Sequence, residues 1–324
     1  MNYRSFGHLS SDTREWVVDL PSDLDLIVGV PRSGMLVSNL LSLYLNVPMT
    51  DVEGLKEGRL LPARDDNVRE FNVANFSKIL VVDDTVASGG TMTEIQETVE
   101  SLDISAETYY GAVYVDLGSE HFVDTYAEVL TTPRVFEWNM MHHGYLAESC
   151  VDLSILCEPS ASLDNDDEPN YQAVLRTAEP KSVPSVKIGW IVTSQPEQYR
   201  EETETWLDAH GIEYGDLIMM GHPDRNSHIA AGNRGEYKAS VYHSSDARLF
   251  IADSYVQALT IARKTSKPVY SKERNVMLRQ GYLSRVARGA RTSIATAQSD
   301  PLYYANRFRS NPVEFSKRVL SNFL

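Results

Sequence analysis

Two adjacent carboxylates, Asp83 and Asp84, stand where the residue types of this chain best suit chemistry on a phosphate. They follow the apolar, β-branched run 79–82, which predicts a fully buried parallel strand. Small residues come next, and a helical pattern begins at Thr91. A strand, a small-residue loop and a helix start direct backbone N–H groups and the positive helix end at one point, which suits an anion. The two carboxylates beside that point suit sugar hydroxyls or a hydrated Mg2+.

A second bend of the same kind lies earlier in the chain. The run 25–30 predicts a buried strand, which ends in a Pro-Arg-Ser-Gly segment at 31–34 and leads into a helical pattern over 35–45. An arginine and a glycine at a strand-to-helix bend suit another phosphate group at the same sheet edge. A plain turn with a surface arginine is the alternative interpretation.

These bends belong to a pattern of alternating strands and helices that continues through the second half of the chain. Such alternation predicts doubly wound parallel sheets. In the second half, strands are predicted over 149–157, 186–193, 216–220 and 248–253, and helices over 196–211 and 236–242.

The composition sets the outer bounds of the molecule. Its 324 residues suggest two domains, and 42% hydrophobic with 23% charged residues is typical of globular proteins. No apolar run reaches membrane-spanning length and the N-terminus lacks a signal-peptide core, so we expect a cytoplasmic protein with no membrane partner. The formal net charge of -15 argues against nucleic-acid binding by the chain as a whole. Cys150 and Cys157 alone make neither a disulfide framework nor a zinc site.

The stretch 79–91 resembles the phosphoribosyl pyrophosphate (PRPP) signature of the type I phosphoribosyltransferases, in which a hydrophobic strand ends in two acids and runs into a Thr/Ser/Gly loop. The resemblance implies that Asp83 and Asp84 are catalytic residues that contact the ribose hydroxyls, and that Asp84 helps to hold Mg2+. It also implies a loop around the 5′-phosphate, formed by Thr85, Ala87, Ser88, Gly89, Gly90 and Thr91.

The earlier bend is similar to the pyrophosphate-binding loop of the same enzymes, so Arg32, Ser33 and Gly34 are expected to bind PRPP as well. In many relatives an aromatic residue near the domain end stacks on the acceptor base, and Phe136 and Trp138 are the candidates here. Relatives that act on 6-oxopurines carry an aspartate in the loop where this chain has Ala87, whose side chain cannot transfer protons. Guanine and hypoxanthine are therefore disfavoured acceptors.

The order of polar residues in the second half resembles the four motifs of the haloacid dehalogenase-like hydrolases. The resemblance implies that Asp152 is a nucleophile and a Mg2+ ligand, and that Asp253 is a second Mg2+ ligand. It implies further that Thr193 and Lys238 bind the phosphoryl group. A carboxylate that attacks phosphorus needs Mg2+ and a lysine to neutralise the developing charge.

Two positions depart from that hydrolase pattern. Ser154 stands where the family has the general acid for the leaving group, and Gln257 lies near the place of a final aspartate. A working phosphatase and a degraded or purely structural domain therefore both remain open.

The segment 272–324 is rich in basic and aromatic residues, and is expected to be helical. It has two candidate partners: the acidic remainder of the chain or of a partner subunit, which the charge favours, and nucleic acid.

Together these features predict two doubly wound α/β domains and a tail: a type I phosphoribosyltransferase fold over 1–147, a haloacid dehalogenase-like Rossmannoid fold over 148–271, and the basic helical tail over 272–324. The expected function is Mg2+-dependent transfer from PRPP to a nucleobase-like acceptor with release of pyrophosphate, followed by 5′-dephosphorylation in the second domain. The alternative is a PRPP-sensing regulator that binds nucleic acid and carries a degenerate hydrolase-like domain. A homo-oligomer is expected.

Overall fold

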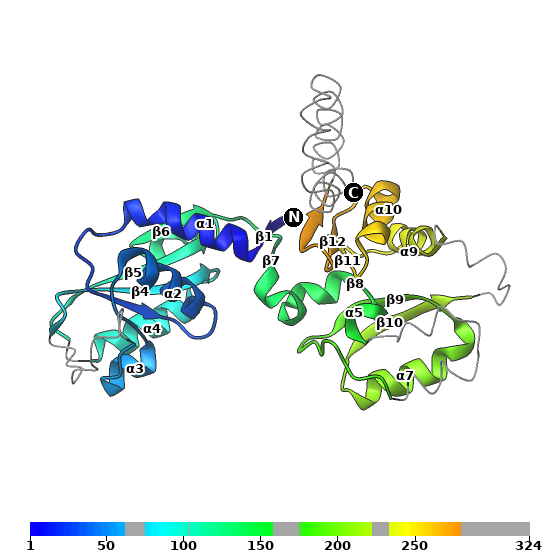
Figure 1. Ribbon diagram of the computed structural model, residues 1–324, viewed down its shortest axis with the longest axis horizontal. Coiled ribbons are helices and arrows are strands. Elements are labelled where there is room, and N and C mark those ends of the chain that lie inside the picture. Colours follow the sequence, from blue (N-terminus) through cyan, green and yellow to red (C-terminus); the bar gives the residue numbers. More distant parts are fainter. Residues whose placement is uncertain (62–74, 103, 158–174, 176, 222–232, 280–324) are drawn as a thin grey trace, which may run out of the picture. The chain divides into compact units, whose positions relative to one another are not determined.

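The computed structural model describes residues 1–61, 75–102, 104–157, 175, 177–221 and 233–279 (Figure 1). The chain divides into two compact units, Met1–Met140 and Met141–Leu324. The division falls before the predicted boundary at 147 because the short helix η5 (Gly144–Glu148) packs against strand β9 (Ile188–Pro196) of the second unit. Within the described residues, no helix has both the length and the apolar character that a membrane crossing requires.

The first unit is built on five parallel strands: β2 (Leu26–Gly29), β3 (Met49–Asp51), β4 (Lys78–Val86), β5 (Glu107–Val115) and β6 (Thr125–Val129). Their order is β3-β2-β4-β5-β6. The apolar residues of the central strands β2 and β4 are buried on both faces, as the predicted parallel sheet requires. The chain moves outward from β2 to β3 on one side and from β4 to β6 on the other, so the winding changes direction between β2 and β4.

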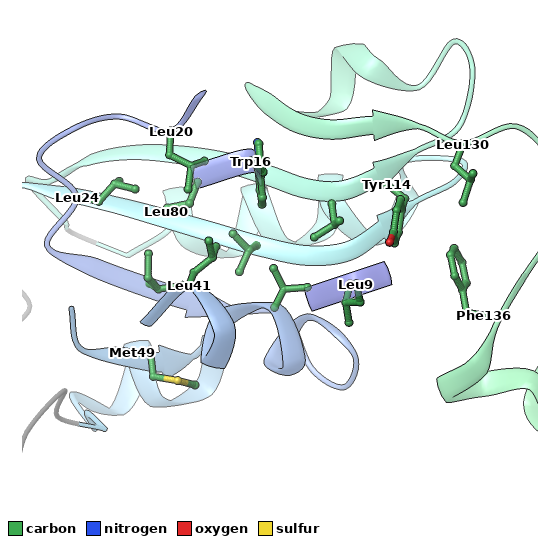
Figure 2. Packing of buried hydrophobic residues seen from close by; sticks show 14 residues of the cluster. Leu9, Trp16, Leu20, Leu24, Leu41, Met49, Leu80, Tyr114, Leu130 and Phe136 are labelled. Carbon is green, nitrogen blue, oxygen red and sulfur yellow. The ribbon is translucent and has the colours of Figure 1, made fainter. Parts of the chain in front are cut away.

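Helices cover both faces of this sheet. On one face, α1 (Phe6–Trp16) and α2 (Gly34–Leu45) bury an apolar cluster in which Trp16 lies against the sheet (Figure 2). On the other face, α3 (Val52–Glu57) and α4 (Gly90–Glu100) bury a second cluster. This arrangement confirms a doubly wound α/β unit.

A separate two-stranded sheet ties the beginning of this unit to its end. Strand β1 (Asn2–Arg4) pairs in parallel with β7 (Arg134–Phe136). Arg4 adds an ion pair to Glu128 in β6, with 2.5 Å from Nη2 to Oε1. The pairing fixes the start of the 3-10 helix η4 (Glu137–His142), which follows β7 directly. Two further 3-10 helices are η1 (Val17–Asp19) and η3 (Glu120–Phe122).

The second unit contains a six-stranded sheet: β8 (Ser149–Asp152), β9, β10 (Tyr214–Met220), β11 (Leu249–Ala252), β12 (Val269–Ser271) and β13 (Val276–Leu278). The order is β10-β9-β8-β11-β12-β13, and only the edge strand β13 is antiparallel to its neighbour. Because β9 and β10 lie on one side of β8 while β11 and β12 lie on the other, the winding changes between β8 and β11.

The helices of the second unit follow its strands in alternation, which confirms the predicted α/β class for this half. Helices α9 (Asn233–Ser244) and α10 (Tyr255–Thr265) contribute to one apolar cluster that also includes Phe250 of β11. The described part of this unit also contains α5 (Leu153–Leu156), α7 (Arg200–Ala209) and the 3-10 helices η5 and η7 (Glu197–Tyr199).

The predicted single strand over 149–157 is wrong beyond its first half. Strand β8 ends at Asp152, whose Oδ1 accepts a hydrogen bond of 3.4 Å from the backbone N–H of Ser154. That cap starts the short helix α5, so the apolar residues after Asp152 continue as helix rather than as strand.

The prediction of a helical tail is wrong at its start. Residues 276–278 form β13, which pairs with β12 and closes the edge of the second sheet. The rest of the predicted tail, from residue 280 onward, lies outside the described residues.

Candidate functional site

The two bends that the sequence singles out meet at the carboxyl edge of the first sheet. Residues 30–33 connect β2 to α2, and residues 87–89 connect β4 to α4. Strands β2 and β4 are neighbours, with Gly29 paired to Val82. Both helices therefore begin where the winding changes, which is the place where doubly wound sheets bind ligands. Their N-terminal N–H groups make that edge suited to anions.

Asp84, near the end of β4, points into the protein. Its side chain is 2% exposed. The Ser33 hydroxyl donates to Oδ1 at 2.7 Å, and the Trp138 indole N–H donates to Oδ2 at 2.7 Å. Hydrogen bonds to both oxygens offset the cost of burying a carboxylate. Each oxygen of Asp84 thus already accepts one hydrogen bond from the protein itself, and its contact with ribose hydroxyls and Mg2+ stays a prediction.

Asp83 is only half-buried, since successive side chains of a strand point to opposite faces. Its Oδ1 accepts a hydrogen bond of 2.7 Å from the backbone N–H of Asp84. Burial, and secondly the neighbouring Asp84 carboxylate, raise the pKa of Asp83 to about 8. Hydroxyl donors or a cation from a ligand would stabilise the ionised form of this carboxylate. Asp83 is therefore the member of the pair that is suited to a ligand.

We expect the ligand-free first unit to lose stability as the pH rises from about 4 to about 8. In this window folded Asp83, with a pKa of about 8, holds a proton that the unfolded chain, with a pKa near 3.8, has lost. Deprotonation is therefore costly only in the folded state. Asp83→Asn should raise the melting temperature by a few °C, and by more at about pH 8 than at about pH 5. Thermal unfolding in EDTA measures this. The exposed Asp23→Asn is the control, and an equal shift at both pH values would contradict the expectation.

Gly34 lets the end of the first loop lie close to β4 at Val82 and Asp83. A β-carbon at this position would lie 2.6 Å from the carbonyl oxygen of Val82 and 3.0 Å from the Cα of Asp83. Only glycine permits such an approach. Before it, Arg32 is exposed and Ser33 is half-buried, and the Pro31–Arg32 peptide is cis. The exposed guanidinium of Arg32 is thus placed beside the loop, where it suits an anionic group.

Contacts from Phe122 and Ser119 fix the conformation of the second loop, and its other residues are largely exposed. Gly89 has φ +80°, and a β-carbon there would collide with the ring of Phe122. The Ser119 hydroxyl donates to the Ala87 carbonyl. The Thr85 hydroxyl is buried and has no hydrogen-bond partner in the part of the chain that the structure describes. The exposed residues of the loop are Ala87, Ser88, Gly90 and Thr91, which leaves small side chains and the start of α4 facing outward.

The two aromatic candidates differ in accessibility. Phe136 is 2% exposed and stacks between Tyr114 and Trp138, at ring-centroid distances of 5.6 and 4.8 Å. It is a core residue, so its ring is not available to a base, which corrects the expectation for Phe136. Trp138 is half-buried and also packs against Phe6, at 5.7 Å. Trp138 remains the candidate for the acceptor side.

Sequence reasoning missed that Ser33, Asp84 and Trp138 form one hydrogen-bonded cluster. It assigned them to three separate tasks, because nothing in their local patterns signals contact across 51 and 54 residues. It also missed Phe122, whose ring lies under Gly89. A positive-φ glycine pattern identifies the turn but not the side chain that packs against it.

The resemblance implies a Mg2+ ion in the first unit, and the donor set fits it at one position. The carboxylate of Asp83 has its pKa raised by burial and by Asp84, so a cation or its bound water would be favourable there. Asp84, hydrogen-bonded on both oxygens, is a poor ligand in this arrangement.

In the second unit, a buried ion pair lies where the winding changes. Lys238 of α9 approaches Asp152 at the end of β8, with 2.5 Å from Nζ to Oδ2, and both side chains are 4% exposed. Lys238 also donates to the amide oxygen of Gln257 at 2.7 Å. Thr193 of β9 is buried beside them in the sheet, since Val192 pairs with Asp152.

Asp253 directly follows β11, the neighbour of β8, so it lies at the same sheet edge as Asp152. Burial raises the pKa of Asp253, Lys181 opposes that shift, and Asp152 adds to it. Among the described residues, no group of three or more His, Cys, Asp or Glu side chains is placed to hold a metal ion. Two carboxylates at adjacent strand ends therefore fit Mg2+ only if carbonyl or water oxygens complete the coordination.

Comparison with known proteins concerns the first unit. The family model for the phosphoribosyl transferase domain matches residues 8–142, less than half of the chain. That range includes both loops, the acid pair and Trp138. No curated protein gives a significant match.

Solved structures with some likeness to the chain include three from microorganisms. A xanthine-guanine-hypoxanthine phosphoribosyltransferase of Helicobacter pylori is 18% identical, with 42% of this chain and 92% of that chain covered and a TM-score of 0.34. A purine phosphoribosyltransferase of Pyrococcus horikoshii is 22% identical, with 42% and 92% covered and a TM-score of 0.31. An orotate phosphoribosyltransferase of Mycobacterium tuberculosis in complex with PRPP is 15% identical, with 39% and 74% covered and a TM-score of 0.26. At these TM-scores the likenesses carry no conclusion about acceptor or reaction.

Proposed function

We propose that the first unit, which carries a phosphoribosyl transferase domain over residues 8–142, transfers the phosphoribosyl group of PRPP to a nucleobase-like acceptor and releases pyrophosphate. One observation carries this proposal. Two loops with helix starts, one bearing Arg32 and the other bearing Ser88 and Thr91, flank the half-buried carboxylate of Asp83 at the change of winding. PRPP requires such a set: two anion sites on either side of a group that accepts hydrogen bonds from ribose hydroxyls.

Binding would divide between the two loops. The segment from Thr85 to Thr91 offers backbone N–H groups, hydroxyls and the start of α4 to the 5′-phosphate. Arg32 and the start of α2 would face the pyrophosphate. Asp83 would accept hydrogen bonds from the ribose hydroxyls, which lie between the two charged ends of PRPP.

The reaction breaks the bond between C1 of the ribose and a pyrophosphate oxygen, and forms an N-glycosidic bond with inversion. Positive charge develops on the ribose ring while negative charge develops on the leaving group. Arg32 and the N–H groups of the first loop would stabilise the departing charge, which is the largest contribution that a site of this kind makes. Mg2+, when bound, adds positive charge next to the pyrophosphate.

Ala87 and Trp138 limit the classes of base that could serve as the acceptor. Ala87 carries no group that could move a proton on a 6-oxopurine, and its side chain is exposed in the loop. The half-buried Trp138 offers an aromatic surface for a base. We therefore propose acceptors whose transfer needs no acid in this loop, such as adenine-type or pyrimidine-type bases.

The test is a screen of bases with labelled PRPP and Mg2+ that follows pyrophosphate release and nucleotide formation. Release that depends on one base would support the transferase. The alternative, a PRPP-sensing regulator, would bind PRPP, release nothing with any base, and shift nucleic acid in a salt-dependent way.

For the second unit we propose phosphoryl transfer of the haloacid dehalogenase-like type. This proposal is supported by an ion pair between Lys238 and Asp152 at one edge of the sheet. The same edge carries Thr193 and Asp253. Asp152 would attack phosphorus and displace the ester oxygen, and water would then hydrolyse the aspartyl phosphate, while Lys238 and Thr193 would hold the phosphoryl oxygens. Residue 154, where the family has the general acid for the leaving group, is a serine. The nucleotide formed by the first unit is the proposed substrate for 5′-dephosphorylation.

We expect the second unit to favour phosphate esters whose leaving group needs no proton. With Ser154 in place of an acid, p-nitrophenyl phosphate should react at least about 100-fold faster than a nucleoside 5′-monophosphate. Ser154→Asp should narrow that ratio, and Asp152→Asn should abolish both activities. Steady-state phosphate release measures this. Equal rates for both substrates with the unchanged protein would contradict the assignment.

The remaining expectations stay predictions: a homo-oligomer, a cytoplasmic location, and docking of the basic tail, most of which lies outside the described residues.

A further inference from the structure

We infer that Asp84 is a positioning residue that couples the pyrophosphate-side loop to the aromatic ring on the acceptor side. The inference rests on the proposed function of the first unit and deepens it. It makes Ser33, Asp84 and Trp138 a relay between two halves of one site, so that occupancy of one half changes the affinity of the other.

The first support is the geometry of the carboxylate. Asp84 uses one oxygen for each partner, at 2.7 Å from the Ser33 hydroxyl and at 2.7 Å from the Trp138 indole N–H. It is 2% exposed, so water hardly competes for these bonds. Hydrogen bonds to a buried charge are strong and are expensive to lose.

The second support is that the loop end of the relay cannot move independently. Ser33 immediately precedes Gly34, which lies so close to Val82 and Asp83 of β4 that a β-carbon would not fit there. A shift of this loop on binding an anion would therefore change the Ser33–Asp84 hydrogen bond.

The third support is that neighbouring side chains constrain the Trp138 indole but leave part of it exposed. The indole of Trp138 stacks on Phe136 at 4.8 Å and 18°, and it packs against Phe6 at 5.7 Å. Its orientation is therefore set by two aromatic neighbours and by the bond to Asp84. Because Trp138 is half-buried, part of its surface is open to an acceptor.

The consequence is cooperative binding. Asp84 accepts from both donors at once, so a change in one bond redistributes charge available to the other. Pyrophosphate or PRPP at the loop should thus order the ring before the acceptor arrives. Both ligands should bind more weakly when either hydrogen bond is removed.

The experiment measures whether a change at one end of the relay alters the KM of the ligand bound at the other end. We expect Trp138→Phe, which keeps a ring and removes the N–H, to raise the KM for PRPP about tenfold as well as that for the acceptor. Ser33→Ala should likewise raise both values. The double variant should show less than the product of the two single effects, because both changes act through Asp84. The matched control is Trp16→Phe, which removes an indole hydrogen bond of 2.9 Å to Thr125 in the same unit but leaves the site intact.

A binding measurement separates this inference from the proposed function. Inorganic pyrophosphate with Mg2+ is titrated into each variant and followed by calorimetry. Weaker binding to Trp138→Phe than to Trp16→Phe would support the relay even if no base gives turnover. Unchanged pyrophosphate binding by Trp138→Phe, or single effects that are confined to one ligand and multiply in the double variant, would overturn it.

Discussion

Replacing Asp83 with asparagine is expected to lower kcat/KM for phosphoribosyl transfer by about 100- to 1,000-fold. The side chain keeps its size and its place in the second half of β4, but it loses the charge that, in the proposed site, would face the ribose and its developing cation. Burial and Asp84 already make that charge costly in the free protein, since they raise the pKa of Asp83 to about 8. A protein that retains such a carboxylate gives up stability for function.

The loss of activity should be separable from any loss of fold. Asp23→Asn changes an exposed aspartate of the same unit that pairs with Lys78 at 2.6 Å, and it should leave kcat/KM within about twofold. Asp83→Asn should be at least as stable as the unchanged protein while it fails to turn over. Full turnover by the Asp83→Asn variant would remove Asp83 from the site.

Replacing Lys238 with methionine should destabilise the second unit by about 3–5 kcal/mol. The change leaves Asp152 without its cationic partner at a position where the side chain is 4% exposed. It also leaves the amide oxygen of Gln257 without the 2.7 Å hydrogen bond from Nζ. Denaturant unfolding, followed by a probe specific to the second unit, measures this effect.

Two companion variants show whether the charge is the cause. Lys264→Met removes an exposed ion pair of 3.0 Å to Glu236 and should cost less than about 1 kcal/mol. Adding Asp152→Asn to Lys238→Met should recover part of the stability, because it removes the unpaired buried charge. A Lys238→Met protein as stable as the Lys264→Met protein would show that the buried pair is not needed for the fold.

Much of the fold was predictable because parallel strands buried on both faces carry a strong local signal. The runs ending at Val30 and Val82 are apolar without alternation, and each precedes a small-residue bend and a helical pattern. Those local signals also placed Asp83 and Arg32 at one sheet edge, since the carboxyl ends of parallel strands share it.

The sequence could not show which of two adjacent strand residues faces the protein interior. Asp83 and Asp84 are chemically equal in the pattern, and only the contacts from Ser33 and Trp138 make Asp84 the buried member. The same limit applies to Phe136, whose apolar ring suits either a base or a core. Neighbours distant in the sequence decide both cases.

The pairing of β1 with β7 has a consequence for synthesis of the chain. Residues 2–4 are made long before their partner strand, which ends at residue 136, so during translation they wait for nearly the whole unit to emerge. Trp138 follows soon after that strand, which ends at Phe136, and its bond to Asp84 can form only afterwards. We therefore expect a nascent chain to complete its five-stranded sheet first and the hydrogen bond between Trp138 and Asp84 last, so that a folded unit without this bond exists on the ribosome for a time.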